Sequence, residues 1–391
     1  MCRNHPGKGK DGRARYGVPD AVPHPVLCET PNSLSWGKGG IRARTPALLR
    51  RGGASGRFCI MDDHLFAELY SFKNLYRSYC AARKRKRFKW ERIEFGLHLE
   101  ENLLTLRNDL IHGMYRHGGY RTFTITDSKK RQIQVAPFRD RVVHHALVNL
   151  IEPIFERAFD PDSYACRKGK GTHRAVRRLR AFMGSASEKY AKRAYCLKCD
   201  ISKYFDTVDH AILLRCISRR IHDMKTMSLI KEIVESTGIP KGIPIGNLTS
   251  QLFANIYLNE LDRFVKHVLR ERYYIRYMDD FLILSRDNKR LRADLDDIRN
   301  FLGGQLKLSL HPKKATIFPI DQGIEFLGYR LYPFYTHLRR STVRRFKTRL
   351  KHYHDGRKFD AALTAWHGYA SWADAYKLER KLIKLSSSTL Q

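Results

Sequence analysis

The chain has 391 residues, with 74 Lys and Arg against 39 Asp and Glu, and a formal net charge of +35. This length allows a large core and two or three subdomains. The charge imbalance favours a polyanionic partner, with a general basic solubility bias as the alternative. No apolar run reaches the roughly 18 residues of a membrane span, and no apolar signal core opens the chain. We therefore expect a cytoplasmic protein with no membrane contact.

The first 60 residues differ in composition from the rest of the chain. They hold 10 of the 26 Gly and 6 of the 14 Pro, with no sustained apolar period. Such a segment buries too little surface to offset its chain entropy, so we expect disorder over residues 1–60. A different pattern begins at Met61, which leads to the hypothesis that Met61 is the natural start and that the preceding residues are a tail or a misassigned leader.

Apolar spacing and turn residues predict the elements that follow. A helix is expected over residues 62–76, followed by a basic run over residues 82–92 that is either a solvated face or a phosphate contact. The further expected elements, in chain order, are a helix over 95–113, a hairpin with strands over 120–126 and 131–135, a helix over 139–155, a strand over 195–205, a helix over 208–221, a loop over 238–246, a helix over 250–269, strands over 273–277 and 281–285, a helix over 289–303, and helices beyond about 340. Strands and helices mix without βαβ regularity, which predicts the α+β class.

Two cysteines, Cys196 and Cys199, form a C-x-x-C motif. No second pair follows at zinc-ligand spacing, so the motif is weak evidence for a metal or redox site. Both lie inside an apolar strand pattern, and we interpret them as ordinary strand residues.

Adjacent acids, Asp279 and Asp280, lie between two apolar runs in the motif Tyr-Met-Asp-Asp. The pattern predicts a β-hairpin with carboxylates at its tip, where a structural turn would rather use Gly or Asn. Two such carboxylates repel each other unless a cation offsets them, and Mg²⁺ prefers oxygen ligands. A third carboxylate, Asp200, ends the strand predicted about 80 residues earlier. The three together favour a two-metal nucleotidyl-transfer site over two unrelated acid clusters.

The set resembles the palm of reverse transcriptases over residues 62 to about 385. Within that family, Gly242-Ile-Pro-Ile-Gly-Asn-Leu-Thr-Ser-Gln251 is most similar to the enzymes of diversity-generating retroelements, since group II intron enzymes have Pro-Gln-Gly where this chain has Pro244-Ile245-Gly246. The resemblance implies a right-hand polymerase with an antiparallel palm sheet and a helical thumb. Fingers would span residues 62–195, palm 196–333 and thumb 334–391.

The resemblance also implies roles for individual residues. Two Mg²⁺ ions, or Mn²⁺ in their place, would be held by Asp200, Ile201, Asp279 and Asp280. Lys314 matches a lysine that protonates the leaving pyrophosphate, with Lys313 as the alternative in register. The residues expected at the incoming nucleotide are Arg131, Lys130, Phe205, Ile245, Gly246 and Gln251.

Phe205 would act by shape, because a ring beneath the sugar excludes a 2′-hydroxyl. The family's Gln at position 245 touches the nascent base pair, so Ile245 removes a polar group there. Residues 163–173, with Arg167 and Lys170, resemble the template-contacting segment and lack Walker spacing. Gly328 lies in a hairpin that resembles the one gripping the primer.

The implied activity is RNA-directed DNA synthesis that misreads template adenines. The implied partners are a template RNA, the cDNA primer and product, dNTPs and a small helical accessory protein that assembles as a ring. Three alternatives stay open. A group II intron or retron-like enzyme would copy accurately, although no maturase module is expected after the thumb. An RNA-dependent RNA polymerase should have a smaller or polar residue near Phe205. A non-catalytic RNA-binding protein should have lost the carboxylates.

Overall fold

The computed structural model describes residues 63–84, 88–126, 130–350, 356–378 and 380. The chain divides into two compact units, residues 1–58 and 59–391, and every described residue belongs to the second. The predictions for residues 1–60, for Met61 and for the basic residues 85–87 lie outside the described residues. Within the described part, no helix is both long and apolar enough to cross a membrane.

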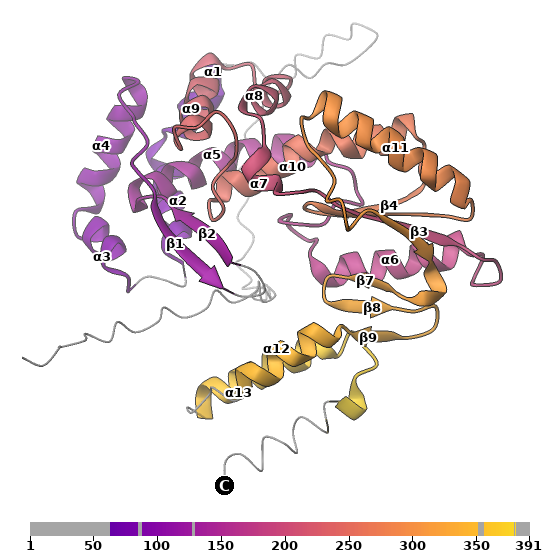
Figure 1. Cartoon of the computed structure of the whole chain (residues 1–391). Coiled ribbons are helices and arrows are strands. Elements are labelled where there is room, and N and C mark those ends of the chain that lie inside the picture. The colour runs from indigo at the N-terminus through magenta and orange to yellow at the C-terminus, as the bar shows by residue number, and fades with distance from the viewer. Residues whose placement is uncertain (1–62, 85–87, 127–129, 351–355, 379, 381–391) are drawn as a thin grey trace, which may run out of the picture. The chain divides into compact units, whose positions relative to one another are not determined.

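The first half of the second unit is mainly helical, with one exposed hairpin (Figure 1). Its elements are α1 (Asp63–Leu69), α2 (Phe72–Arg83), α3 (Trp90–Leu97), α4 (Leu99–Ile111), β1 (Arg121–Thr126), β2 (Lys130–Val135), α5 (Phe138–Glu156) and α6 (Thr172–Ala186). The predicted hairpin is confirmed: β1 and β2 pair antiparallel, with Arg121 opposite Val135. Pro137 is the residue before α5, which confirms the predicted helix there.

Two predicted helices are each broken in two. The helix expected over residues 62–76 is wrong, because Ser71 interrupts it and its side chain accepts a hydrogen bond from the Asn74 backbone N–H as the N-cap of α2. Serine competes for backbone groups in this way and so favours helix starts over interiors. The helix expected over residues 95–113 is likewise divided at His98, where α3 ends and α4 begins.

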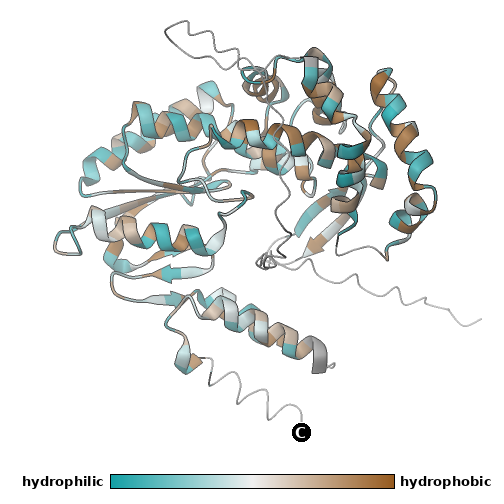
Figure 2. Ribbon diagram, turned by 180° about the vertical axis from the view of Figure 1, so that it is seen from behind, coloured by the Kyte–Doolittle hydropathy of each residue, from teal (hydrophilic) through white to brown (hydrophobic). Residues whose placement is uncertain are grey.

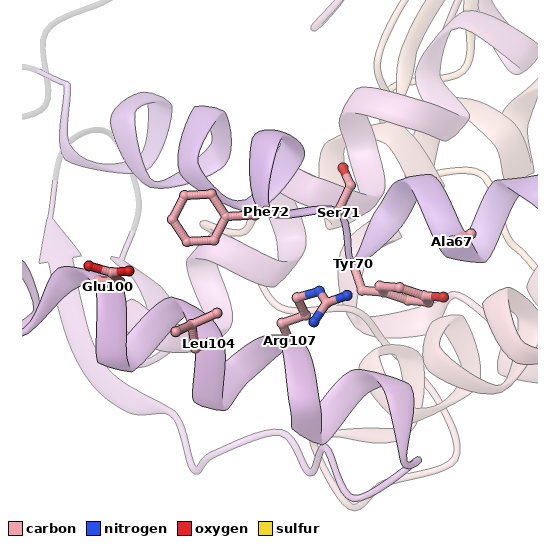
Figure 3. Close-up of a pocket in the computed structure, with 7 residues that line it drawn as sticks. All are labelled: Ala67, Tyr70, Ser71, Phe72, Glu100, Leu104 and Arg107. Atoms are coloured by element: carbon pink, nitrogen blue, oxygen red, sulfur yellow. The ribbon is translucent and has the colours of Figure 1, made fainter.

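The break between α1 and α2 leaves a cavity of about 520 Å³ against α4. Figure 3 shows Tyr70 and Phe72 from the break facing Leu104 and Arg107 of α4. The Arg107 guanidinium lies 5.8 Å from the centroid of the Tyr70 ring. None of the sequence-predicted site residues lines this cavity.

The second half of the unit builds an antiparallel sheet and the helices that cover it. Its elements are β3 (Tyr195–Asp200), α7 (Tyr204–Thr207), α8 (His210–Ser218), α9 (Met224–Glu235), α10 (Leu248–Arg263), η1 (Phe264–Val268), β4 (Tyr273–Tyr277), β5 (Asp280–Ser285), α11 (Asn288–Gln305), β6 (Thr316–Pro319), η2 (Ile320–Gln322), β7 (Ile324–Phe326), β8 (Tyr329–Leu331), β9 (Thr336–Leu338), α12 (Arg340–Leu350) and α13 (Gly356–Ala370). The strand expected over residues 195–205 is too long: it ends at Asp200, and Phe205 lies on the short helix α7.

The main sheet has the strand order β4-β5-β3-β6, with every pair antiparallel. Alternate residues of a strand point to opposite faces, and β3 contributes to two cores accordingly. Leu197 and Cys199 join the larger core, whereas Cys196 joins a second one with Leu282 of β5. Both cysteines are buried strand residues on opposite faces, which confirms the strand interpretation of the C-x-x-C motif.

Helices cover both faces of this sheet, with α10 and α11 on one side and α6 on the other (Figure 1). Most of α10 is buried. The buried positions of α11 recur at helical spacing through Leu291, Leu295, Ile298 and Leu302, and Figure 2 shows polar residues on its outer side. Antiparallel sheets and helices without βαβ repetition confirm the α+β class.

Candidate active site

The three predicted carboxylates lie at one end of the main sheet. Asp200, the last residue of β3, is directly opposite Asp280, the first residue of β5. Met278 and Asp279 form the two-residue tip between β4 and β5. The backbone N–H of Ile201 donates to the Asp279 carbonyl over 3.1 Å, which joins the hairpin tip to the end of β3. Directly opposed residues of an antiparallel pair point to the same face, so Asp200 and Asp280 share one side of the sheet.

Burial and repulsion by neighbouring acids make Asp279 and Asp280 costly to ionise. Burial raises the pKa of Asp280 to about 6, and the charges of Asp200 and Asp279 add to that effect while Lys198 opposes it. Burial also raises the pKa of Asp279, with a further contribution from Asp200. The Oδ1 atom of Asp280 is buried with no hydrogen-bond partner in the described chain. Such a site gains stability from a nearby cation.

A lysine supplies part of that positive charge in this structure. Lys314 Nζ donates to Asp200 Oδ2 over 2.5 Å. The segment that carries Lys314 is held beside β3, because the backbone N–H of His311 donates to the Asp200 carbonyl over 2.8 Å. The neighbouring Lys313 is exposed. Of the two lysines considered in this register, Lys314 is the one at the carboxylates.

The site offers carboxylate oxygens, which are the ligands that a divalent ion such as Mg²⁺ prefers. These oxygens lie at the same end of the sheet and include the unpartnered Asp280 Oδ1. The carboxylates are not, however, placed around a common point as metal ligands would be. Among the described residues, no group of three or more His, Cys, Asp or Glu side chains could hold a metal. Lys314 instead pairs with one of the two carboxylate oxygens of Asp200.

A loop between α9 and α10 carries Ile245 and Gly246, and it contacts Phe205 at one point and the β1–β2 hairpin at another. The backbone N–H of Ile243 donates to the Phe205 carbonyl over 2.8 Å, and the Ile245 carbonyl accepts from the Gln134 N–H of β2 over 3.1 Å. Gly246 has φ +127°, and a Cβ there would lie 3.0 Å from the Gln134 carbonyl oxygen. Only glycine allows this approach. The loop therefore joins α7 to the β1–β2 hairpin. Gln251 follows on α10 and is half-buried.

Arg131 and Lys130 lie on β2 of that hairpin, opposite Ile125 and Thr126. Both side chains are exposed. Burial, a hydrogen bond from the Asp279 backbone and the charges of Asp200 and Lys314 have the larger effects on the pKa of Asp279, and the positive charge of Arg131 also lowers that pKa. The fold thus places Arg131 on the carboxylate side of the hairpin.

In the segment expected to contact the template, Arg167 is hydrogen-bonded to other groups of the protein. The guanidinium of Arg167 donates to both oxygens of Glu156 and to the carbonyls of Asp160 and Ser163, and its side chain is 5% exposed. These bonds fix the loop and leave little of Arg167 for a template. Lys170 is half-buried, with Nζ 2.6 Å from the Pro161 carbonyl oxygen and 4.9 Å from the centroid of the Tyr164 ring.

The hairpin with Gly328 forms as predicted, between β7 and β8. Its tip residues Leu327 and Gly328 have φ +50° and +88°. The hydroxyl of Tyr369, from α13, donates to the Leu327 carbonyl over 2.9 Å, and the Arg339 backbone N–H donates to the Gly328 carbonyl over 2.9 Å. The tip is therefore packed against the C-terminal helices.

A buried network that the sequence analysis missed supports the Tyr-Met-Asp-Asp turn. Arg276 and Asp262 are both 0% exposed and form two hydrogen bonds of 2.6 Å. Arg276 Nη1 also donates to the Met278 carbonyl over 3.2 Å. Met278 has φ +55°, a strained value for a residue with a side chain. The available signal was the arginine itself, placed inside an otherwise apolar strand, where a charge needs a partner.

Comparisons with known proteins identify the family. Residues 124–331 match the family described as "Reverse transcriptase (RNA-dependent DNA polymerase)". Protein YkfC of Escherichia coli K12 is 30% identical over 275 residues, covering 60% of this chain and 72% of that protein. The group II intron-encoded protein LtrA of Lactococcus lactis is 25% identical over 303 residues, covering 59% of this chain and 49% of that protein.

Among solved structures, telomerase from Candida albicans, in complex with a fragment of telomeric RNA, is similar with a TM-score of 0.47 and 10% identity over 70% of this chain and 55% of that one. The family match covers more than half of the chain. The match identifies the class of protein as enzymes that make DNA on an RNA template. The chain belongs to the reverse transcriptase family and is an RNA-directed DNA polymerase. Its similarity extends to group II intron-encoded proteins and spans about half the length of the Lactococcus protein. The retroelement subtype stays a prediction.

Proposed function

We propose that this enzyme extends a primer 3′-end with deoxynucleotides at the end of the main sheet, with Asp200, Asp279 and Asp280 as the metal-binding carboxylates and the Ile201 backbone beside them. The observation that carries the proposal is the register of β3 and β5, which sets Asp200 opposite Asp280 next to the Asp279 tip. When bound, two Mg²⁺ ions, or Mn²⁺ ions, would activate the primer 3′-oxygen and offset charge on the leaving pyrophosphate.

The remaining side chains would position the substrate and move a proton. Lys314 Nζ, now at Asp200 Oδ2, is the proton donor for the leaving pyrophosphate. Arg131 and Lys130 would hold the triphosphate from the hairpin, since Arg131 already acts electrostatically on Asp279. Phe205, half-buried beside the loop at Ile243, would exclude a 2′-hydroxyl. In this proposal the fingers span residues 62–195, the palm 196–333 and the thumb 334–391.

Primer extension on an RNA template tests the catalytic assignment. Asp280→Asn removes one charge at nearly constant shape, and we expect the turnover rate to fall by at least about a hundredfold, a common loss when one charge-stabilising group is removed. Asp296→Asn is the matched control, since Asp296 is exposed on α11 and, among the described residues, forms an ion pair only with Arg299 one turn away. A near-normal rate for Asp280→Asn, with the fold intact by circular dichroism, would refute the assignment.

The role of Phe205 separates DNA synthesis from RNA synthesis. We expect Phe205→Val to raise the use of rNTPs relative to dNTPs, because the smaller side chain leaves room for the 2′-hydroxyl. The readout is the ratio of kcat/KM for the two nucleotide types on the same primer and template. An unchanged ratio would contradict the gate, and a wild-type preference for rNTPs would favour an RNA-dependent RNA polymerase.

A second candidate function is mutagenic copying at template adenines, as in diversity-generating retroelements. The observation that favours it is Ile245, an apolar side chain in the loop bound to both α7 and β2. Accurate copying, as by a group II intron-like enzyme, fits the comparisons equally well. In the mutagenic case the template would be a structured RNA, and a small ring-forming helical protein would assist.

Sequencing cDNA made by the purified enzyme from a defined RNA distinguishes the two. The retroelement proposal expects substitutions concentrated at adenines, and it expects Ile245→Gln to reduce them because an amide regains contact with the nascent pair. Ile245→Leu keeps the apolar character and serves as the control. Uniformly accurate copying by the wild-type enzyme would replace this proposal with the group II-like one.

A further inference from the structure

A second cavity lies away from the carboxylates, between α5, α8 and α10. Its volume is about 280 Å³, and α10 contributes a stripe of four residues at i, i+3, i+4 and i+7. Those residues are Ile256, Asn259, Glu260 and Arg263. None of the residues assigned to the polymerase site lines this cavity. The proposed reaction therefore leaves it without a use.

Three buried apolar side chains and one buried amide contribute to the cavity wall. Phe155, Phe159 and Ile256 are 3%, 7% and 3% exposed, and they form flat or branched apolar walls. Asn259 is only 9% exposed, and its Oδ1 atom has no hydrogen-bond partner in the described part of the chain. Buried polar atoms in folded proteins are nearly always paired, because an unpaired one costs folding free energy. An unpaired acceptor in a cavity wall is suited to a donor on a bound molecule.

The rim of the cavity is cationic. Arg219 donates to Glu260 over 2.7 Å, so that pair is neutral overall. Arg220 and Arg263 are exposed, and neither forms an ion pair with another described residue. The cavity thus combines aromatic walls, one unpaired acceptor and two unpaired guanidinium groups at its mouth.

We propose that this cavity binds one unpaired nucleotide of an RNA outside the polymerase site. The base would lie beside Phe155, Phe159 and Ile256 and donate an N–H to Asn259 Oδ1, and the phosphate would pair with Arg220 and Arg263. At about 280 Å³, the cavity is at the small end of ligand sites, whose volumes begin near roughly 300 Å³. This volume is slightly below that range, so we expect the cavity to take a base but not a whole nucleotide, which would leave the phosphate at the rim.

The chemistry favours a nucleotide over simpler ligands. Inorganic phosphate would use the arginines and leave the aromatic walls and the amide without a partner. An apolar molecule would leave the amide and both guanidinium groups without one. Proteins commonly recognise unpaired RNA bases by combining stacking with hydrogen bonds to the base edge. A chain with net charge +35 also attracts RNA over long distances.

Photo-cross-linking with 8-azido-AMP tests the site on the full chain. We expect cross-linked peptides from the segments around Phe155 and Asn259, and protection by AMP but not by inorganic phosphate at equal concentration. Asn259→Leu keeps the volume and removes the acceptor, and it should weaken AMP binding by about tenfold, a typical loss for one base-edge contact. Cross-links confined to other segments, or equal protection by phosphate, would overturn the proposal.

Surface variants keep the test informative if Asn259→Leu fails to fold. Arg263→Ala should weaken AMP binding, whereas Arg215→Ala should not, because Arg215 is exposed on the same helix as Cys216 but does not line the cavity. Equal weakening by both variants would mean general charge attraction and would overturn the site. Neither arginine belongs to the proposed polymerase site, so the KM for dNTPs should stay unchanged in both.

A competition arm identifies the source of the nucleotide. An RNA hairpin with an unpaired loop should displace 8-azido-AMP more strongly than a blunt duplex of the same length, which supports RNA as the occupant. Equal displacement of 8-azido-AMP by both RNAs would overturn the proposal in favour of attraction to the RNA backbone. Displacement by AMP but by neither RNA would overturn it in favour of a free nucleotide. Displacement by an acidic peptide as effective as the hairpin would also overturn it.

Discussion

Replacing both members of the buried pair Arg276 and Asp262 should lower the rate of DNA synthesis and leave the stability of the fold nearly unchanged. Both side chains are fully buried, and two 2.6 Å hydrogen bonds join them. Burial alone would lower the pKa of Arg276, but the carboxylate of Asp262 outweighs it and holds that pKa above its usual value. The arginine is therefore charged, and removing its partner leaves an uncompensated buried charge.

The magnitudes follow from that geometry. Asp262→Asn should destabilise the protein by about 3–5 kcal/mol, the usual cost of breaking one side of a buried pair. The double variant Arg276→Met with Asp262→Leu removes both charges, and such replacements are often neutral in stability. It also removes the hydrogen bond from Arg276 to the Met278 carbonyl. A bond from a charged donor contributes about 1.5–3 kcal/mol, so the rate should fall roughly 10- to 150-fold.

Urea unfolding and primer extension measure the two effects on the same preparations. The expected result is a double variant close to wild type in stability but with a much lower kcat and a similar KM for dNTPs. Arg276→Lys keeps the charge without the planar fork and should be intermediate in rate. A double variant that is both stable and fully active would refute the claim that Arg276 positions the Tyr-Met-Asp-Asp turn.

Three further expectations concern other parts of the chain. In EDTA, Asp280→Asn should gain stability relative to wild type as the pH rises from about 4 to about 6. The folded pKa of Asp280, about 6, is above its ordinary value of 3.8, so the wild-type protein loses stability between these two pH values and no more above them, by on the order of 3 kcal/mol in urea unfolding. Gly328→Ala should lower the melting temperature, because its Cβ would overlap the Tyr369 hydroxyl at φ +88°, whereas Gly303→Ala on α11 meets no atom and should not lower it. A zinc chelator should leave the melting temperature unchanged, since Cys196 and Cys199 face opposite sides of β3; a drop would mean that they share a metal.

Local pattern was enough to predict the elements that carry the chemistry. The apolar runs on both sides of Asp279 and Asp280 and the apolar run before Asp200 predicted strands that the structure has, because a short apolar run and a hairpin tip depend on neighbouring residues alone. The β1–β2 hairpin and α5 followed from turn residues and Pro137 in the same way. The errors were at boundaries, as at Ser71, where a side-chain cap overrode a continuous apolar rhythm.

The sequence by itself determined the chemical inventory: three carboxylates in order along the chain, a basic surface and an α+β pattern. Only the tertiary structure decided which groups meet. The register of β3 and β5 sets Asp200 opposite Asp280, and the partners of Arg276 and of Arg167 come from α10 and α5. Contacts between residues far apart in the chain depend on packing and on the pairing of buried charges. Neither of these produces a periodic pattern in the local sequence from which it could be predicted.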